Sequence, residues 1–141
     1  MKTEGVLLDT GPLVAFFDQS ERFHGWAAEQ FRRLDGAVHT CEAVITEALF
    51  LLRRTPEAQR RLLGYVEDEV ISLRFDLRDE IQSVRGLWEH YRDVPMSLAD
   101  ACLVRMSELW EGYPLLTLDS DFRIYRRHRR QHIRCILPPG V

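Results

Sequence analysis

The chain alternates between short apolar runs and longer stretches in which apolar residues recur at helical spacing. The short runs predict strands at residues 5–8, 37–40, 70–75, 115–118 and 133–137. The longer stretches predict helices at residues 11–20, 21–34, 42–53, 57–66, 79–91 and 97–111, and a short one at 122–127. This alternation is typical of an α/β fold, in which helices cover both faces of a mostly parallel sheet. Ligands bind such sheets at the carboxyl ends of the strands.

Two aspartates stand at that predicted edge of the sheet. Asp9 directly follows the apolar run Val-Leu-Leu, and Asp119 follows Leu-Leu-Thr-Leu. Aspartate is also a common residue at helix caps and in turns after strands, so this position alone leaves a purely structural role open for both.

Two further acids lie beside apolar residues on predicted helices. The positions three and four residues from Glu47 are all apolar, which predicts that its carboxylate lies on the buried face of the helix. A buried carboxylate needs hydrogen bonds, a cation or an ion pair, and a pair with an arginine is the structural alternative. Asp100 precedes Leu103 and Val104 by one turn. It also completes a capping box with Ser97, and the two roles are compatible.

These four carboxylates come from segments spread over the whole chain, and the predicted fold gathers them at one edge. Hard oxygen ligands of this kind suit Mg²⁺ or Mn²⁺. Such an ion activates water and stabilises the charge that develops when a phosphodiester is hydrolysed. Without a cation the acids would repel a phosphate, so we expect the reaction to depend on a metal.

Four segments resemble, in order, the motifs of PIN domains and in particular of VapC-like toxins: VLLDTGPLVA, AVITEALFLL, SLADACLV and LLTLDSDF. The resemblance extends over nearly the whole chain. It implies one PIN domain at residues 1–141, a three-layer sandwich, and a Mg²⁺-dependent endoribonuclease that could also use Mn²⁺. The catalytic residues that it implies are Asp9, Glu47, Asp100 and Asp119. The metal ligands are Asp9, Asp100 and Asp119, and the auxiliary residues are Thr10, Thr117 and Asp121.

The resemblance also implies partners. We expect an RNA substrate, an antitoxin protein and a homodimer. The alternative is a PIN-fold protein that binds RNA or a partner with weak or no catalysis and acts without an antitoxin. We expect the aromatic-rich stretches to pack in the core. The alternative is that they form a groove for an antitoxin helix or a dimer interface. These stretches contain Phe16, Phe17, Phe23, Trp26, Leu49 and Phe50.

Charge adds a second candidate surface. The net charge is −3, yet residues 123–141 contain six arginines and no acid, while residues 1–122 carry 22 acidic against 13 basic side chains. We expect Arg123, Arg126 and Arg127 to contact RNA phosphates on a short helix, with Tyr125 stacking on a base. The alternative is that these arginines form a solvated surface.

The remaining features point to a cytoplasmic protein. No apolar run approaches the roughly 20 residues of a membrane span, and the N-terminus lacks the features of a signal peptide. The three cysteines are widely spaced, so we expect reduced thiols. His128 and His132 are four residues apart, and we expect them on a solvated helical face rather than at a metal site.

Overall fold

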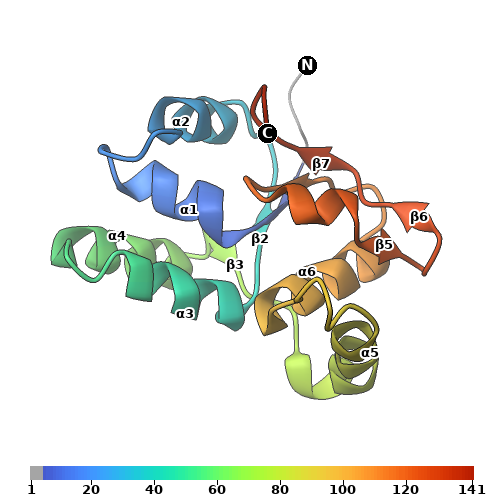
Figure 1. Cartoon of the computed structure of the whole chain (residues 1–141). Helices are drawn as coiled ribbons and strands as arrows, with labels where there is room; N and C mark the ends of the chain where they lie inside the picture. The colour runs from blue at the N-terminus through green and yellow to red at the C-terminus, as the bar shows by residue number, and fades with distance from the viewer. Residues whose placement is uncertain (1–4) are drawn as a thin grey trace.

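A five-stranded parallel sheet forms the centre of the molecule in this computed structural model, which describes residues 5–141 (Figure 1). The strands lie in the order β3-β2-β1-β4-β7. Their bounds are β1 (Val6–Leu8), β2 (Val38–His39), β3 (Ile71–Ser72), β4 (Leu115–Leu116) and β7 (Cys135–Ile136). All five predicted strands are present, although each is shorter than the apolar run that predicted it.

Helices cover both faces of this sheet, which confirms the predicted three-layer α/β architecture. They are α1 (Thr10–Phe17), α2 (His24–Arg32), α3 (Glu42–Leu51), α4 (Pro56–Glu67), α5 (Leu77–His90) and α6 (Leu98–Leu109). In Figure 1, α1 to α4 lie to the left of the strands, and α5 and α6 lie to the lower right. Helix α1 packs against α2 and α3, while α5 packs along α6, which also contacts β1.

The strand order places a topological switch point between β1 and β4. The chain steps outward from β1 to β2 and β3, and then returns to the other side of β1 to form β4. All three residues of β1 are fully buried, as expected for a central strand covered on both faces. The buried Thr40 hydroxyl donates to the carbonyl of Leu8 at 2.6 Å and fixes the end of β1. The carboxyl ends of β1 and β4 are therefore the expected place for a ligand.

The segment after β4 differs from the prediction. Residues 120–123 form a 3₁₀ helix, η1 (Ser120–Arg123), and an antiparallel hairpin of β5 (Arg126–Arg127) and β6 (Gln131–His132) follows. The predicted helix at 122–127 is therefore wrong beyond residue 123. His128 and His132 consequently share no helical face, because His128 stands in the hairpin loop and His132 in β6.

Two smaller expectations are also resolved. The three cysteines are free, and Cys41 and Cys102 are buried. Of the aromatics in the apolar-rich stretches, Phe17 lies in the core, whereas Phe50 is 62% exposed.

Within residues 5–141, no helix combines the length and the apolar character that crossing a membrane requires.

Candidate active site

The four acids that the sequence singled out line one open cleft of about 530 Å³ at the carboxyl edge of β1 and β4. The chain thus brings Asp9, Glu47, Asp100 and Asp119 together from four separate segments. Among residues 5–141, no arginine or histidine lines this cleft. The other residues that line it are Thr10, Gly11, Leu51, Ser97, Leu118 and Ser120.

Asp9 is the most buried of these acids, and both of its oxygens accept hydrogen bonds. Oδ1 accepts from the backbone N–H of Thr10 at 2.7 Å, which caps α1. Oδ2 accepts from the hydroxyl of Thr117 at 2.6 Å. The Thr117 oxygen in turn accepts from the backbone N–H of Asp119 at 3.0 Å. Thr117 is fully buried, so this one hydroxyl sets the position of two acids relative to each other.

Gly11 allows the two loops that carry these acids to approach closely. A Cβ atom built on Gly11 would lie 3.1 Å from the Cβ of Leu118, closer than ordinary van der Waals contact. A side chain at position 11 would therefore push the start of α1 away from the loop that follows β4. Gly11, two residues after Asp9, thus allows the close approach of the two segments that line the cleft.

Asp100 lies at the start of α6, and two donors share its Oδ2 atom. The backbone N–H of Ser97 donates to this oxygen, and the Ser97 hydroxyl accepts from the N–H of Asp100, so the predicted capping box is present. The hydroxyl of Tyr125 donates to the same Oδ2 at 3.2 Å. Asp100 therefore caps α6 and also lines the cleft. Its Oδ1 atom accepts no hydrogen bond from residues 5–141.

Glu47 does not lie on a buried face, so this prediction was wrong. Its side chain is exposed, because two of the apolar neighbours that suggested burial, Phe50 and Leu51, are themselves exposed. The carboxylate instead extends toward the cleft, and its Oε2 accepts from the hydroxyl of Thr10 at 2.9 Å. The arginine ion pair considered as an alternative is also absent among residues 5–141. Glu47 is thus the solvent-facing acid of the set.

Burial and mutual repulsion raise the pKa values of the inner acids. Burial raises the pKa of Asp9 to about 7, although its hydrogen bonds from Thr117 and Thr10 oppose the shift. Asp100 and Asp119 add repulsion in the same direction. Burial, and then the charge of Asp119, likewise raise the pKa of Asp100, while the hydrogen bonds from Ser97 and Tyr125 lower it. The cleft therefore favours any cation that offsets these charges.

The donor set fits a hard divalent cation. Asp9, Asp100 and Asp119 offer carboxylate oxygens only, and each is oriented by a hydrogen bond from a neighbouring donor. Across residues 5–141, no group of three or more acidic, histidine or cysteine side chains is placed so that it could hold a metal ion. Mg²⁺ needs fewer protein ligands, because it commonly keeps several waters and binds through one or two carboxylates together with substrate phosphate.

The three arginines expected to bind RNA are not equivalent. Arg123 ends η1 and is exposed. The guanidinium of Arg126 donates to backbone carbonyls of residues 123–125, and that of Arg127 donates to the carbonyl of Ser107 and pairs with Glu111 at 2.6 Å. Arg126 and Arg127 thus hold local structure, and neither lines the cleft.

Two further expectations for this segment need correction. Tyr125 is fully buried and cannot stack on a base. Phe122 and Tyr125 are three positions apart, and in the structure their rings pack edge to face at 5.2 Å. Asp121 does not line the cleft either, although its backbone N–H donates to Oδ1 of Asp119 at 2.8 Å. Asp121 thus contacts Asp119 through its main chain, and an auxiliary role for Asp121 stays a prediction.

The comparisons with known proteins agree with this fold. The family model described as PIN domain matches residues 6–127. The chain is similar to a solved structure of the Mycobacterium tuberculosis toxin VapC20, which is described as cleaving the sarcin-ricin loop. The TM-score is 0.70 and the sequence identity is 20%. The match covers 82% of this chain and 91% of that one. No curated protein sequence matches the chain. Because the family model covers the segments that carry all four acids of the cleft, the chain belongs to the PIN-domain family.

Proposed function

We propose that this protein is an endoribonuclease that hydrolyses RNA with the help of Mg²⁺, or of Mn²⁺ in its place. One observation carries the proposal: within the described part of the chain, four carboxylates and no basic side chain line the cleft. A phosphodiester cannot approach such a surface unless a cation offsets the charge. Membership of the PIN-domain family and the fold shared with a toxin described as a sarcin-ricin loop nuclease support the same reading.

In this proposal Asp9, Asp100 and Asp119 hold the ion. A bound Mg²⁺ lowers the pKa of a water molecule and stabilises negative charge on the phosphate oxygens. Thr117 keeps Asp9 and Asp119 at a fixed separation, because its hydroxyl bridges the carboxylate of one and the backbone N–H of the other. Tyr125 orients Asp100 from the buried side through its hydroxyl.

Glu47 has a different role in the proposed reaction. Its Oε2 atom is held by the hydroxyl of Thr10, while Oε1 has no hydrogen bond from residues 5–141. The side chain is exposed at the mouth of the cleft, where water and substrate enter. We assign Glu47 to orienting the attacking water and accepting its proton at Oε1.

The proposal includes a biological role as the toxin of a VapBC-like pair. Its support is the family together with exposed apolar residues beside the cleft. Phe50 is 62% exposed and Leu51 is 55% exposed, and Leu51 itself lines the cleft. A protein partner bound to these residues would cover Glu47 as well. The same exposed helix end is available for a dimer contact.

The direct test is cleavage of RNA by the purified protein with added divalent ions. We expect cleavage with Mg²⁺ or Mn²⁺ and none in EDTA, with products that carry a 5′-phosphate and a 3′-hydroxyl. Asp119→Asn should abolish cleavage, and Asp93→Asn, at an exposed position outside the cleft, serves as the matched control. Cleavage that persists in EDTA, or products that end in a cyclic phosphate, would contradict the proposal.

A further inference from the structure

The β5–β6 hairpin has a strained tip. Its loop consists of His128, Arg129 and Arg130, closed by a hydrogen bond from the N–H of Arg130 to the carbonyl of Arg127 at 3.3 Å. His128 and Arg129 have φ values of 49° and 67°. Two successive residues in the left-handed region favour Asn-Gly, and a side chain there costs roughly 1–2 kcal/mol per residue. The chain nevertheless places a histidine and an arginine at these positions.

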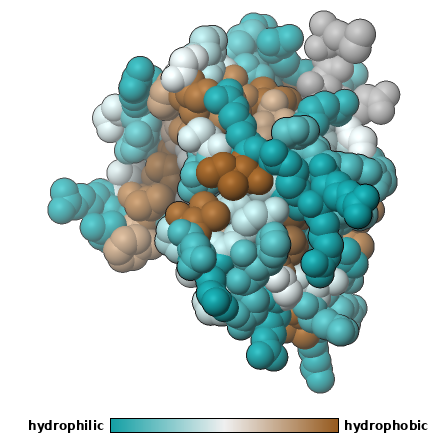
Figure 2. Space-filling model, turned by 45° about the vertical axis from the view of Figure 1, so that its right-hand side comes forward, coloured by the Kyte–Doolittle hydropathy of each residue, from teal (hydrophilic) through white to brown (hydrophobic). Residues whose placement is uncertain are grey.

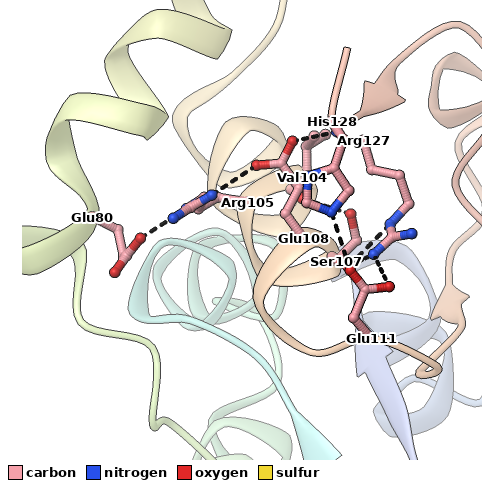
Figure 3. A network of polar contacts seen from close by, with 8 residues as sticks. All are labelled: Glu80, Val104, Arg105, Ser107, Glu108, Glu111, Arg127 and His128. Carbon is pink, nitrogen blue, oxygen red and sulfur yellow. Dashed lines mark hydrogen bonds and ion pairs between the residues drawn. The ribbon is translucent and has the colours of Figure 1, made fainter. Parts of the chain in front are cut away.

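The base of the hairpin is fastened to the C-terminal half of α6, as Figure 3 shows. The guanidinium of Arg127 donates to the carbonyl of Ser107 at 2.7 Å and pairs with Glu111. The backbone N–H of His128 donates to Glu108 at 2.6 Å, and its ring lies 3.1 Å from Glu111. These contacts fix the loop on the helix that also carries Asp100. The tip is therefore presented in one orientation.

The same contacts leave the tip positively charged. Glu108 and Glu111 are engaged with the base of the hairpin, and Glu108 also binds Arg105. Arg129 and Arg130 are exposed, and neither forms an ion pair with another residue of the described chain, 5–141. The five residues 128–132 are all exposed and all polar. In Figure 2, where this side of the molecule comes forward, most of the visible surface is hydrophilic.

A groove of about 320 Å³ lies beside the hairpin, between it and α5. Arg126 and Arg129 line one side of this groove, and Nη1 of Arg126 already donates to the backbone carbonyls of residues 123–125. Helix α5 contributes His90 and the neutral donors Gln82 and Ser83 on the other side. Glu108 also lines the groove, but its carboxylate already accepts hydrogen bonds from Arg105 and from the hairpin backbone. The groove thus offers cationic and neutral donors of the kind that hold phosphate oxygens.

We propose that the tip of the β5–β6 hairpin and the groove beside it form a second RNA contact, which binds the phosphate backbone of the substrate at a distance from the cleft. This inference rests on the proposed ribonuclease function. Asp100 and Glu108 are eight residues apart on α6, so the contact lies roughly 12 Å along the helix from the acids. RNA bound there would be recognised through its shape and its phosphate backbone rather than through contacts to its bases in the cleft.

The surface favours RNA over an acidic protein as the occupant. Protein interfaces have an apolar, largely charge-free centre, whereas phosphate contacts rest on arginine and neutral hydrogen-bond donors. Residues 128–132 contain no apolar side chain. The loop and β6 also lie outside residues 6–127, the part of the chain that matches the PIN-domain model. The tip of the hairpin thus lies beyond the matched family segment, whereas the α5 side of the groove and Arg126 lie within it.

The test compares two double variants that remove the same charge. Arg129→Ala with Arg130→Ala changes the tip, and Arg32→Ala with Arg33→Ala changes exposed arginines at the end of α2. Fluorescence anisotropy in EDTA measures the binding of a labelled RNA hairpin. We expect the tip variant to bind about tenfold more weakly at low salt, with a salt slope that is smaller by about 1–2 units. The α2 variant should match the wild type, and circular dichroism checks that both are folded.

Cleavage separates the failure of this inference from the failure of the proposed function. With Mg²⁺, the ratio of kcat/KM for the RNA hairpin to that for a trinucleotide should fall about tenfold in the tip variant. If the wild type cleaves RNA and both variants match it in binding and in this ratio, the second RNA contact is refuted. The proposed nuclease function is supported in that case. If the wild type neither binds nor cleaves RNA, both proposals fall. Loss of binding to polyglutamate with unchanged RNA binding would show a protein-binding tip and overturn the inference.

Discussion

The hydroxyl of Thr117 lies 2.6 Å from Oδ2 of Asp9, although the two residues are 108 positions apart in the chain. This contact spans the junction between β1 and β4 and couples two of the acids in the cleft. It also opposes part of the rise that burial causes in the pKa of Asp9. A single buried hydroxyl therefore affects both the geometry and the charge of the site.

Thr117→Val tests this coupling with almost no change in side-chain volume. The variant should lose about 10- to 100-fold in activity, the usual cost of removing a group that orients a metal ligand. The half-saturating Mg²⁺ concentration should rise, because the pKa of Asp9 rises further when this hydrogen bond is lost. Thr117→Ser, which keeps the hydroxyl, should restore most of the activity. Equal activity in the valine and serine variants would contradict this role.

The raised pKa of Asp9 predicts a pH dependence of stability in metal-free protein. The pKa of Asp9 is about 7 in the folded state and its ordinary value is 3.8, so between these pH values the folded state binds a proton that the unfolded state lacks. Stability should therefore decrease as pH rises from about 4 to 7. Asp9→Asn should remove this decrease and raise the Tm at pH 7 by a few degrees.

Thermal unfolding in EDTA at several pH values measures this effect. The difference in Tm between Asp9→Asn and the wild type should be largest near pH 7 and should shrink toward pH 4. A difference that stays constant over this range would show that Asp9 is already ionised throughout. Added Mg²⁺ should reduce the difference, because an ion that binds the folded wild type stabilises it by mass action.

Glu47→Gln should separate activity from stability. The amide oxygen can still accept from Thr10, and the side chain is exposed, so the free energy of unfolding should change by less than about 0.5 kcal/mol. RNA cleavage should fall by about 100-fold or more, because the proposed proton acceptor is lost. Glu42→Gln, at an exposed position on the same helix, is the matched control. A stability loss above 2 kcal/mol would instead identify Glu47 as a structural residue.

Tyr125→Phe should weaken the support of Asp100 without leaving a cavity. The ring packs against Phe122 and Tyr91, and phenylalanine keeps those contacts. Loss of the hydroxyl should cost about 1 kcal/mol of stability, and calorimetric titration should show weaker Mn²⁺ binding. Unchanged Mn²⁺ affinity would leave Tyr125 as a packing residue only.

Arg129→Gly should raise stability while it lowers RNA affinity. Arg129 has a φ of 67°, a conformation that glycine adopts without steric cost. The gain should be about 1 kcal/mol, measured by urea denaturation, and RNA binding should weaken as described for the tip variant. A loss of stability would mean that the arginine side chain makes contacts that outweigh its backbone strain.

The sequence predicted best those parts of the molecule where burial and local pattern agree. Strands β1 and β4 are continuous apolar runs, and each leads to an acid that the fold then places in the cleft. The cap role of Asp100 was visible because Ser97 and Asp100 have the spacing of a capping box. In these cases the same residues determine the element and position the functional group.

Predictions from the sequence were wrong where the local pattern of apolar residues does not match their burial in the structure. Glu47 has apolar neighbours, but periodicity cannot tell that Phe50 and Leu51 remain exposed beside the cleft. The β5–β6 hairpin was missed because its strands are polar and its turn lacks the glycine that usually marks a hairpin. The hydrogen bond from Tyr125 to Asp100 joins residues that are distant in sequence and is visible only in the folded chain.

The central position of β1 has a consequence for synthesis of the protein. Asp9 leaves the ribosome 108 residues before its partner Thr117, which follows β4 together with Asp119. Strands β2 and β3 can join β1 early, whereas the opposite side of β1 stays open until β4 is made. A nascent chain therefore carries its first acid without the assembled cleft. The order of translation therefore leaves the cleft incomplete until β4 and the residues that follow it have been made.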